Sequence, residues 1–179
     1  MEKWHGRIAL VTGASAGIGL NMVQELLKYD MKVVGCARRK ELIQAKDETK
    51  RDKLYAYECD LNQTANIEAM FQWINDHPDL GHVDLCVANA GTTSHHGLLD
   101  ASPEEWTAMV NVNIVAVSLC VQLSVKSMLN HKIMNGHIVF INSMSGHAVH
   151  PHPLTRFYSA TKFAVTALVQ GWRQEVRQE

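Results

Sequence analysis

A phenol and an ammonium group stand four residues apart near the carboxyl end of the chain, as Tyr158 and Lys162 in the run YSATK. Because positions i and i+4 share one face of a helix, the two groups can converge on one substrate. A free phenol titrates with a pKa of ~10, and a neighbouring ammonium favours the phenolate that proton transfer near neutral pH requires. The same spacing is common on helices for structural reasons alone, so the pair needs further partners to indicate catalysis.

Further polar residues follow two of the predicted strands. Ser143 follows an apolar run over 137–141, and Asn89-Ala90-Gly91 follows the run over 83–88. Ligands of open α/β sheets bind outside the carboxyl ends of the strands. We therefore expect Ser143 to hydrogen-bond a substrate carbonyl oxygen from the side of Tyr158, and the turn after Ala88 to face a bound cofactor.

The sequence TGASAGIG, residues 12–19, joins the first predicted strand to the first predicted helix. Its glycines allow a sharp turn and let a pyrophosphate approach the helix N-terminus, where the dipole favours an anion. The spacing is G-x-x-x-G-x-G rather than the commoner G-x-G-x-x-G. Glycine clusters also occur in loops that bind nothing, but this position between strand and helix predicts a dinucleotide site. The predicted contacts are Gly13, Ser15, Gly17, Ile18 and Gly19.

The end of the second predicted strand indicates which dinucleotide is bound. An NAD site usually has a carboxylate there for the ribose 2′-hydroxyl, whereas this chain has Ala37 followed by Arg38 and Arg39. A guanidinium can pair bidentately with a 2′-phosphate, which a carboxylate would repel. This predicts NADP(H), with Arg38 as the first contact and Arg39 as the second. The alternative is that both arginines only solvate a surface loop.

Short apolar runs alternate with longer helical patterns along the whole sequence. Runs that are apolar nearly throughout are typical of strands buried on both faces of a parallel sheet. Strict β-α-β alternation predicts an α/β fold, a doubly wound parallel sheet of the Rossmann type that forms one domain over residues 1–179. The predicted strands are 8–12, 32–36, 54–58, 83–88 and 137–141, and the predicted helices are 17–29, 40–51, 64–76, 103–130 and 157–178.

Composition limits the partners and the compartment. The chain has 17 basic and 18 acidic side chains and no basic cluster, which argues against nucleic acid or an anionic membrane surface as the main partner. The most apolar stretch, 114–125, is about half the length of a membrane span and is interpreted as a buried helix. The start of the chain shows no signal-peptide pattern. The four scattered cysteines predict reduced core thiols in a cytoplasmic protein.

Together these motifs resemble the short-chain dehydrogenase/reductase family, and the resemblance covers essentially the whole chain. The features that match the family's order and approximate spacing are the turn at 12–19, Asn89-Ala90-Gly91, Asn113, Ser143 and the Tyr158/Lys162 pair. The runs GCARR at 35–39 and INSMSGH at 141–147 are similar to one branch of the family. That branch contains the insect farnesol dehydrogenases and the vertebrate family member eleven.

The resemblance implies a catalytic role for four residues. Tyr158 would be the general acid in carbonyl reduction and the general base in alcohol oxidation, and Lys162 would favour its phenolate and hold the nicotinamide ribose. Ser143 would orient the substrate oxygen. Asn113 would anchor a water chain that carries protons to Lys162. The hydride passes directly between nicotinamide and substrate, so no metal is expected.

The resemblance also implies further cofactor contacts and the partners. Asp60 is similar to the family's adenine-contacting acid and is followed by Leu61, and Asn89 would lie against the adenine ribose. The substrate would be a small carbonyl or alcohol, and isoprenoid alcohols, steroids and small carbonyls all stay open. A homodimer or tetramer is expected for the full-length form.

Family members continue after the helix that carries Tyr158, with a sixth strand, a Pro-Gly turn, a substrate-covering segment and a seventh strand. None of these follows here. We therefore expect a C-terminally truncated form with an uncovered apolar edge strand over 136–141, impaired stability and little turnover. The alternative function is a non-catalytic nucleotide-binding or subunit-interaction module.

Histidines gather near the proposed tyrosine. His147, His150 and His152 lie in a proline-containing loop just before it, and His95 and His96 lie elsewhere. A metal site would need ligands on rigid elements. Three interpretations of these histidines stay open: they line the substrate pocket, they belong to a solvated loop, or they bind a metal ion. The metal site is the least favoured of the three.

Overall fold

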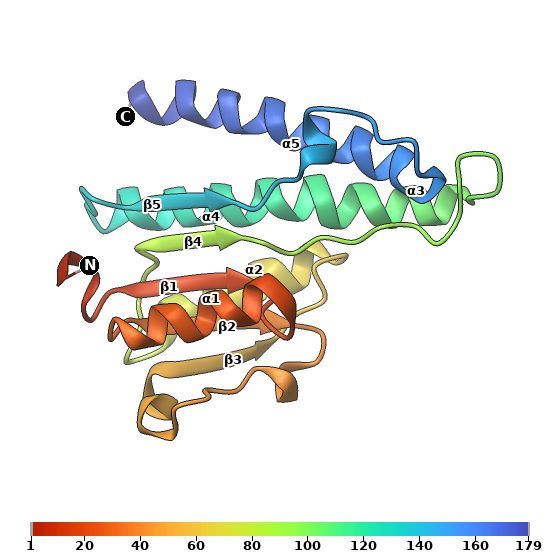
Figure 1. The fold of residues 1–179 in the computed structure, drawn as a ribbon. Helices are drawn as coiled ribbons and strands as arrows, with labels where there is room; N and C mark the ends of the chain where they lie inside the picture. The colour runs from red at the N-terminus through yellow and green to blue at the C-terminus, as the bar shows by residue number, and fades with distance from the viewer. Residues whose placement is uncertain (1, 179) are drawn as a thin grey trace.

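The protein forms one five-stranded sheet, here in a computed structural model that describes residues 2–178. The strands lie in the order β3-β2-β1-β4-β5, and all neighbours are parallel (Figure 1). This confirms the predicted α/β fold with a doubly wound parallel sheet. The strand bounds are β1 Ile8–Thr12, β2 Lys32–Ala37, β3 Leu54–Glu58, β4 Leu85–Ala88 and β5 His137–Phe140.

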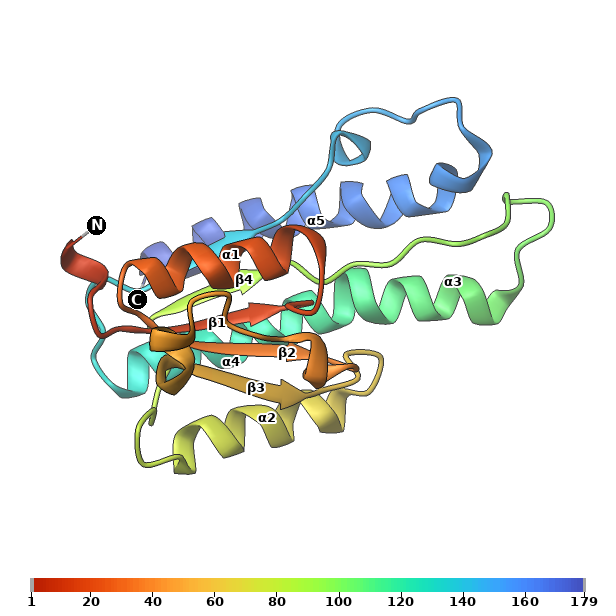
Figure 2. The same cartoon turned by 60° about the horizontal axis from the view of Figure 1, so that its bottom comes forward.

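Helices cover both faces of the sheet. In Figure 2, α1 and α5 lie on one side, and α2 and α4 on the other. Every residue of β1 is buried, as expected for a central strand packed on both faces. The helix bounds are α1 Gly17–Lys28, α2 Thr64–Asp76, α3 Pro103–Val110, α4 Val117–Asn130 and α5 Arg156–Glu175.

The predicted long helix over 103–130 is a single helical path with a π-helical segment, Asn111–Ala116, between α3 and α4. It starts with a capping box in which the Ser102 hydroxyl accepts from Glu105 N–H, while the Glu105 carboxylate accepts from Ser102 N–H. The helix is long and apolar enough to cross a membrane by length and composition alone. It also packs against β4, α2 and the rest of the core.

The prediction of a helix over 40–51 is wrong. The segment forms two short 3-10 helices, Lys40–Leu42 and Glu48–Lys53, with extended chain between them. The buried Gln24 side chain of α1 explains the extended part. Its Nε2 donates to the Gln44 carbonyl oxygen at 2.7 Å, and its Oε1 accepts from Lys46 N–H at 2.8 Å. These bonds satisfy backbone groups that a helix would have paired internally.

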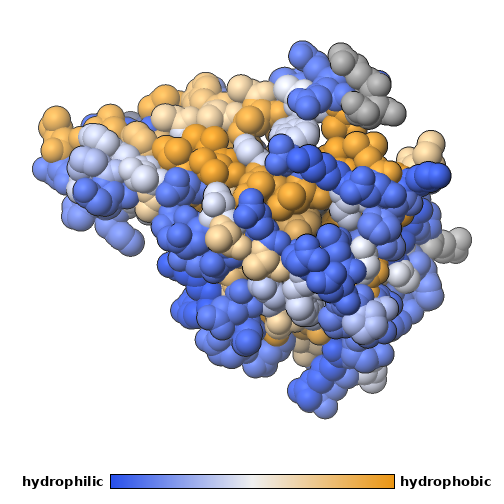
Figure 3. Space-filling model, turned by 180° about the vertical axis from the view of Figure 1, so that it is seen from behind, coloured by the Kyte–Doolittle hydropathy of each residue, from blue (hydrophilic) through white to orange (hydrophobic). Residues whose placement is uncertain are grey.

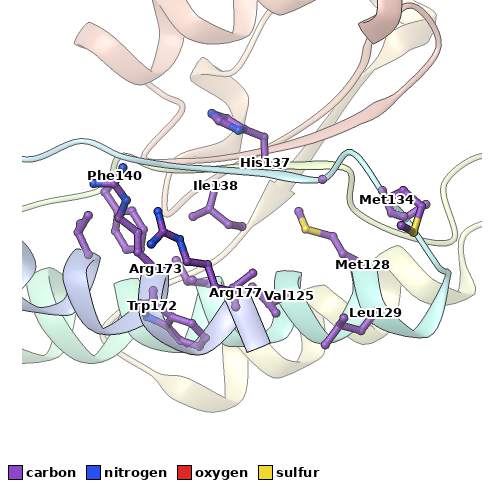
Figure 4. Close-up of a pocket in the computed structure, with 15 residues that line it drawn as sticks. Val125, Met128, Leu129, Met134, His137, Ile138, Phe140, Trp172, Arg173 and Arg177 are labelled. Atoms are coloured by element: carbon purple, nitrogen blue, oxygen red, sulfur yellow. The ribbon is translucent and has the colours of Figure 1, made fainter. Parts of the chain in front are cut away.

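An apolar groove runs beside β5, which is an edge strand as predicted. Figure 3 shows apolar side chains gathered in the upper part of the molecule, where α4, β5 and α5 lie in Figure 1. The groove has a volume of about 650 Å³. Figure 4 shows Ile138 of β5 pointing toward the helices. Ile138, Val125 of α4 and Trp172 of α5 pack against one apolar cluster.

Candidate active site

The turn after β1 brings two glycines into the left-handed region. Gly13 has a φ of +66° and Gly17 a φ of +55°, which side chains with a Cβ rarely adopt. A Cβ on Gly19 would collide with the Gly13 carbonyl oxygen and lie 2.5 Å from Asn89 Nδ2. Ala16 gives α1 no side-chain cap, so the first amides of the helix stay available to an anion. This cradle fits a pyrophosphate.

Thr12, the last residue of β1, ties the ends of β1 and β4 together. Its hydroxyl oxygen accepts from the N–H groups of Asn89 and Ala90, both at 3.0 Å. In return, Asn89 Nδ2 donates to the Thr12 carbonyl oxygen at 2.8 Å. The sequence reasoning assigned no role to Thr12, although its position directly before the first glycine was an available signal.

A cleft of about 510 Å³ opens over the carboxyl ends of β1 to β4. Most of the predicted cofactor contacts line it. The exceptions are Ile18 and Gly19, in the first turn of α1, and Tyr158 and Lys162, on α5. The predicted residues in the lining are Gly13, Ser15, Gly17, Arg38, Arg39, Asp60, Leu61, Asn89, Ala90 and Gly91.

Arg38 and Arg39 border this cleft directly after β2. Both are exposed, and neither guanidinium forms an ion pair or hydrogen bond with another residue of the range 2–178. Lys40, the next residue, lies 3.9 Å from Glu58. Two unpaired guanidinium groups at the edge of a phosphate-binding cleft fit a 2′-phosphate.

Ser143 begins a short 3-10 helix, Met144–Gly146, and its hydroxyl oxygen accepts from Ser145 N–H at 3.1 Å. This short helix is fixed on α5, because the Thr166 hydroxyl donates to the Gly146 carbonyl oxygen at 2.9 Å. A Cβ on Gly146 would lie 2.7 Å from the carbonyl oxygen of Lys162. Glycine therefore permits the close approach that holds Ser143 beside the helix carrying Tyr158.

Tyr158 and Lys162 share one face of α5, as predicted. Lys162 Nζ lies 5.7 Å from the centre of the Tyr158 ring and donates to the Ile141 carbonyl oxygen at 2.9 Å. Lys162 is 4% exposed, and its burial lowers the pKa of the ammonium group. Among residues 2–178, no hydrogen bond joins the Tyr158 hydroxyl to Ser143. Ser143 directly precedes the short 3-10 helix that is bonded to α5, and α5 also carries Tyr158.

Asn113 lies in the π-helical segment and is fully buried. Its Nδ2 donates to the Thr92 carbonyl oxygen at 2.8 Å and to Thr161 Oγ1 at 3.0 Å, and its Oδ1 accepts from Thr92 N–H at 2.8 Å. These bonds join the loop after Gly91 to α5. Segments of π-helix are frequent at functional sites. The role of Asn113 as anchor of a water chain to Lys162 stays a prediction.

Two contacts near the site were missed by the sequence reasoning. The ring of Trp106 stacks on Phe157, the residue before Tyr158, with centres 5.5 Å apart. His96 Nδ1 lies 2.9 Å from Glu105 and, mainly by its hydrogen bond, lowers the pKa of that carboxyl to about 2. The first contact joins α3 to α5 and the second joins the loop over 92–101 to α3, so both link segments that no local pattern brings together.

The loop histidines do not form a cluster of metal ligands. His147 and His152 are exposed and His150 is half-buried. In the described part of the chain, no group of three or more His, Cys, Asp or Glu side chains could hold a metal ion.

Comparison with known proteins gives consistent matches over almost the whole chain. The sequence matches the short chain dehydrogenase family over residues 7–179. It is 45% identical to chicken (Gallus gallus) dehydrogenase/reductase SDR family member 11, covering 99% of this chain and 71% of that protein. It is 37% identical to farnesol dehydrogenase of Aedes aegypti, covering 99% of this chain and 73% of that enzyme.

A solved structure gives the same result. A metagenomic short-chain oxidoreductase in complex with NADP superposes with a TM-score of 0.85 at 30% identity, over 98% of this chain and 77% of that one. The matched region contains the glycine turn, the cleft and the helix with Tyr158 and Lys162. The chain therefore belongs to the short-chain dehydrogenase/reductase family of oxidoreductases.

Proposed function

We propose that this protein interconverts a carbonyl compound and an alcohol with NADP(H), Tyr158 acting as the general acid and base. The observation that carries the proposal is the placement of Tyr158 and the buried Lys162 on one face of α5, with the ammonium 5.7 Å from the phenol ring. The polar cleft and the family supply the context.

The chain's own residues would transfer the proton and orient the substrate. When bound, a nicotinamide dinucleotide supplies hydride to a carbonyl carbon or accepts it from an alcohol. Tyr158 donates its hydroxyl proton to the carbonyl oxygen in reduction and takes a proton from the alcohol in oxidation. Lys162 stabilises the phenolate by its charge. Ser143, on the segment fixed to α5, orients the substrate oxygen.

Asn113 would contribute by position. It links Thr92, in the lining of the cofactor cleft, to Thr161, the residue before Lys162. We propose that it keeps the buried ammonium group next to the cleft and anchors the water through which Lys162 regains its proton.

The preference for NADP(H) rests on Arg38 and Arg39. The cleft has two arginines and no carboxylate at the end of β2, and a similar solved structure contains NADP. Replacing either arginine by alanine should weaken NADP+ binding about tenfold, because a charge-assisted contact is lost. The affinity for NAD+ should stay nearly constant. Lys40→Ala is the matched control, since Lys40 lies beside Glu58 instead. Equal losses for both cofactors would contradict the preference.

The activity is tested by NADPH oxidation with a reactive dicarbonyl. Tyr158→Phe should lower turnover by about 1,000-fold while NADPH still binds. Tyr29→Phe is the control, because Tyr29 is exposed at the end of α1, away from the cleft. NADPH binding without any turnover in the unaltered protein would instead favour the non-catalytic nucleotide-binding module.

A further inference from the structure

Thr166 follows Tyr158 and Lys162 along α5. The three residues are four positions apart, so each lies about one helical turn beyond the one before it. Thr166 is half-buried, and no step of the proposed mechanism uses it. Its hydroxyl group is nevertheless the point at which the segment containing Ser143 is bonded to α5.

The Thr166 hydroxyl binds this segment on both sides of Ser143. Before Ser143, Asn142 Nδ2 donates to Thr166 Oγ1 at 2.8 Å. After Ser143, the Thr166 hydroxyl donates to the Gly146 carbonyl oxygen at 2.9 Å, while the Lys162 carbonyl oxygen of its own helix is more distant, at 3.2 Å. Ser143 is therefore held between two hydrogen bonds to a single side chain.

Neither of these two groups has another partner that could replace Thr166. Among residues 2–178, the Asn142 side chain forms no other hydrogen bond, and its buried Oδ1 has no partner. In the same part of the chain, the Gly146 carbonyl oxygen accepts only from Thr166. A buried polar group that loses its partner costs free energy, so removal of the Thr166 hydroxyl should let the segment move.

Gly146 lets the segment come close enough to α5 for these bonds. A Cβ at this position would lie 2.7 Å from the Lys162 carbonyl oxygen and 2.8 Å from Asn142 Nδ2. Both distances are shorter than van der Waals contact, so a side chain here would push the segment away from the helix. The Thr166 hydroxyl then fixes the segment at this short distance.

Two further bonds orient Ser143 within the segment. Its hydroxyl oxygen accepts from Ser145 N–H at 3.1 Å, and its carbonyl oxygen accepts from Gly146 N–H at 2.9 Å. The hydroxyl proton has no acceptor among residues 2–178, so it is available to a substrate oxygen. Because Ser143 is bonded to Gly146, a shift of Gly146 on α5 also shifts the Ser143 hydroxyl relative to Tyr158.

We propose that Thr166 is a positioning residue that fixes Ser143 relative to Tyr158, an inference that rests on the proposed oxidoreductase function. A substrate oxygen that accepts from both hydroxyls needs each of them within about 3 Å. A misplacement of about 1 Å can lower the rate of an enzymatic reaction about 100-fold. Thr166 acts only through Ser143 and contacts neither substrate nor cofactor itself.

The kinetic test measures NADPH oxidation with a reactive dicarbonyl. Thr166→Val keeps the shape of the side chain and removes its hydroxyl. We expect kcat to fall about tenfold, while KM for the dicarbonyl and Kd for NADPH stay within about twofold. Thr166→Ser restores the hydroxyl and should bring kcat back to within about twofold of the unaltered protein. Thr107→Val is the matched control, because the exposed Thr107 hydroxyl donates only to the Pro103 carbonyl oxygen of its own helix, α3.

A double variant separates positioning from a general loss of structure. Ser143→Ala removes the group through which Thr166 acts and should itself lower kcat about 100-fold. Adding Thr166→Val to Ser143→Ala should then lower kcat by less than about twofold more. The same tenfold loss in both backgrounds would overturn the inference, because Thr166 would then act on something other than Ser143.

Hydrogen exchange tests the attachment of the segment without turnover. The N–H groups of Ser145 and Gly146 both bond to Ser143, so they should exchange about tenfold faster in Thr166→Val and at the unaltered rate in Thr107→Val. Unchanged exchange in Thr166→Val would overturn the inference, whatever the kinetics. If the unaltered protein binds NADPH without turnover while exchange responds to Thr166→Val, the proposed function and the positioning role both fail. The attachment of the Ser143 segment by Thr166 then stands as a structural bond alone.

Discussion

The sheet carries two cavities of similar size and opposite character. The cleft over the carboxyl ends of β1 to β4 has a volume of about 510 Å³, and the groove beside β5 one of about 650 Å³. Glycines, two arginines, an aspartate and two asparagines are among the residues that line the cleft, whereas valine, leucine, isoleucine, methionine and tryptophan dominate the groove. The kind of ligand that a cavity suits therefore depends little on its volume and mainly on the backbone and side-chain groups that line it.

The difference has a structural cause. In the cleft, a turn and a helix N-terminus leave polar backbone groups without partners, and these suit an anion. In the groove, the edge of the sheet and two helices leave apolar surface without a neighbour. The total accessible surface is 9944 Å², more than the about 8,700 Å² that scaling with mass gives for a folded chain of this size. The cleft is thus built for a polar ligand, and the groove is an apolar face that stays open.

The largest expected effect is in the cleft. Gly19→Ala should weaken NADP+ binding by about 100-fold, because the new methyl group would displace the Gly13 carbonyl and Asn89. Binding is measured by titration calorimetry on protein whose folding is checked by circular dichroism. Gly17→Ala is the control, since open space surrounds that position and only its positive φ is strained. We expect a loss of about fivefold there, and equal losses at both positions would contradict a steric cradle.

The second effect is in the groove and should spare the cleft. Trp172→Ala should lower the free energy of unfolding by about 2 kcal/mol, because the half-buried indole packs on the cluster of Val117 and Val121. Urea titration measures this loss, and the affinity of the folded protein for NADP+ should change less than about twofold. Phe163→Ala is the control on the same helix. That ring is 42% exposed, so less than about 1 kcal/mol is expected.

The cleft was largely predictable from the sequence, because its parts are local. A glycine turn between a strand and a helix, two arginines after a strand and an i, i+4 pair on a helix are each written in a few consecutive residues. Ile8–Thr12 and Leu54–Glu58 were predicted with the observed bounds, and α2 likewise. The structure places the glycine turn and the two arginines in the lining of the cleft, whereas the i, i+4 pair lies outside that lining, on α5.

What escaped prediction depends on contacts between distant segments. Thr12, Thr161 and Thr166 hold the site together through bonds to residues 20 to 78 positions away. Residues 40–51 do not form the predicted helix, because the buried Gln24 side chain of α1 hydrogen-bonds to their backbone. No local periodicity encodes such pairings.

A third prediction concerns the pH dependence of stability. Burial lowers the pKa of Lys162 in the folded protein below its usual 10.5. Between the lowered pKa of the folded protein and the usual pKa of the unfolded chain, the unfolded chain binds more protons than the folded one. The free energy of unfolding should therefore rise with pH across that window, by at most about 1.4 kcal/mol per pH unit. Lys162→Met should remove this rise. The lost bond to Ile141 lowers stability equally at every pH, so only the difference in slope counts. If the free energy of unfolding depended on pH in the same way in both proteins, the lowered pKa of Lys162 would be contradicted.

The smallest expected effect on stability comes from two exposed methionines, one in the groove and one outside it. Met134 lies in the groove lining and is 90% exposed, and Met144 lies next to Ser143 and is 77% exposed. Replacing either by lysine should change the free energy of unfolding by less than about 0.5 kcal/mol, because neither side chain is packed. A fluorescent dye that binds apolar surface should nevertheless bind less to Met134→Lys than to Met144→Lys, because the apolar surface is concentrated beside β5. Equal dye binding by the two variants would mean that the apolar surface is not confined to the groove, and the contrast between the two cavities would then rest on the cleft alone.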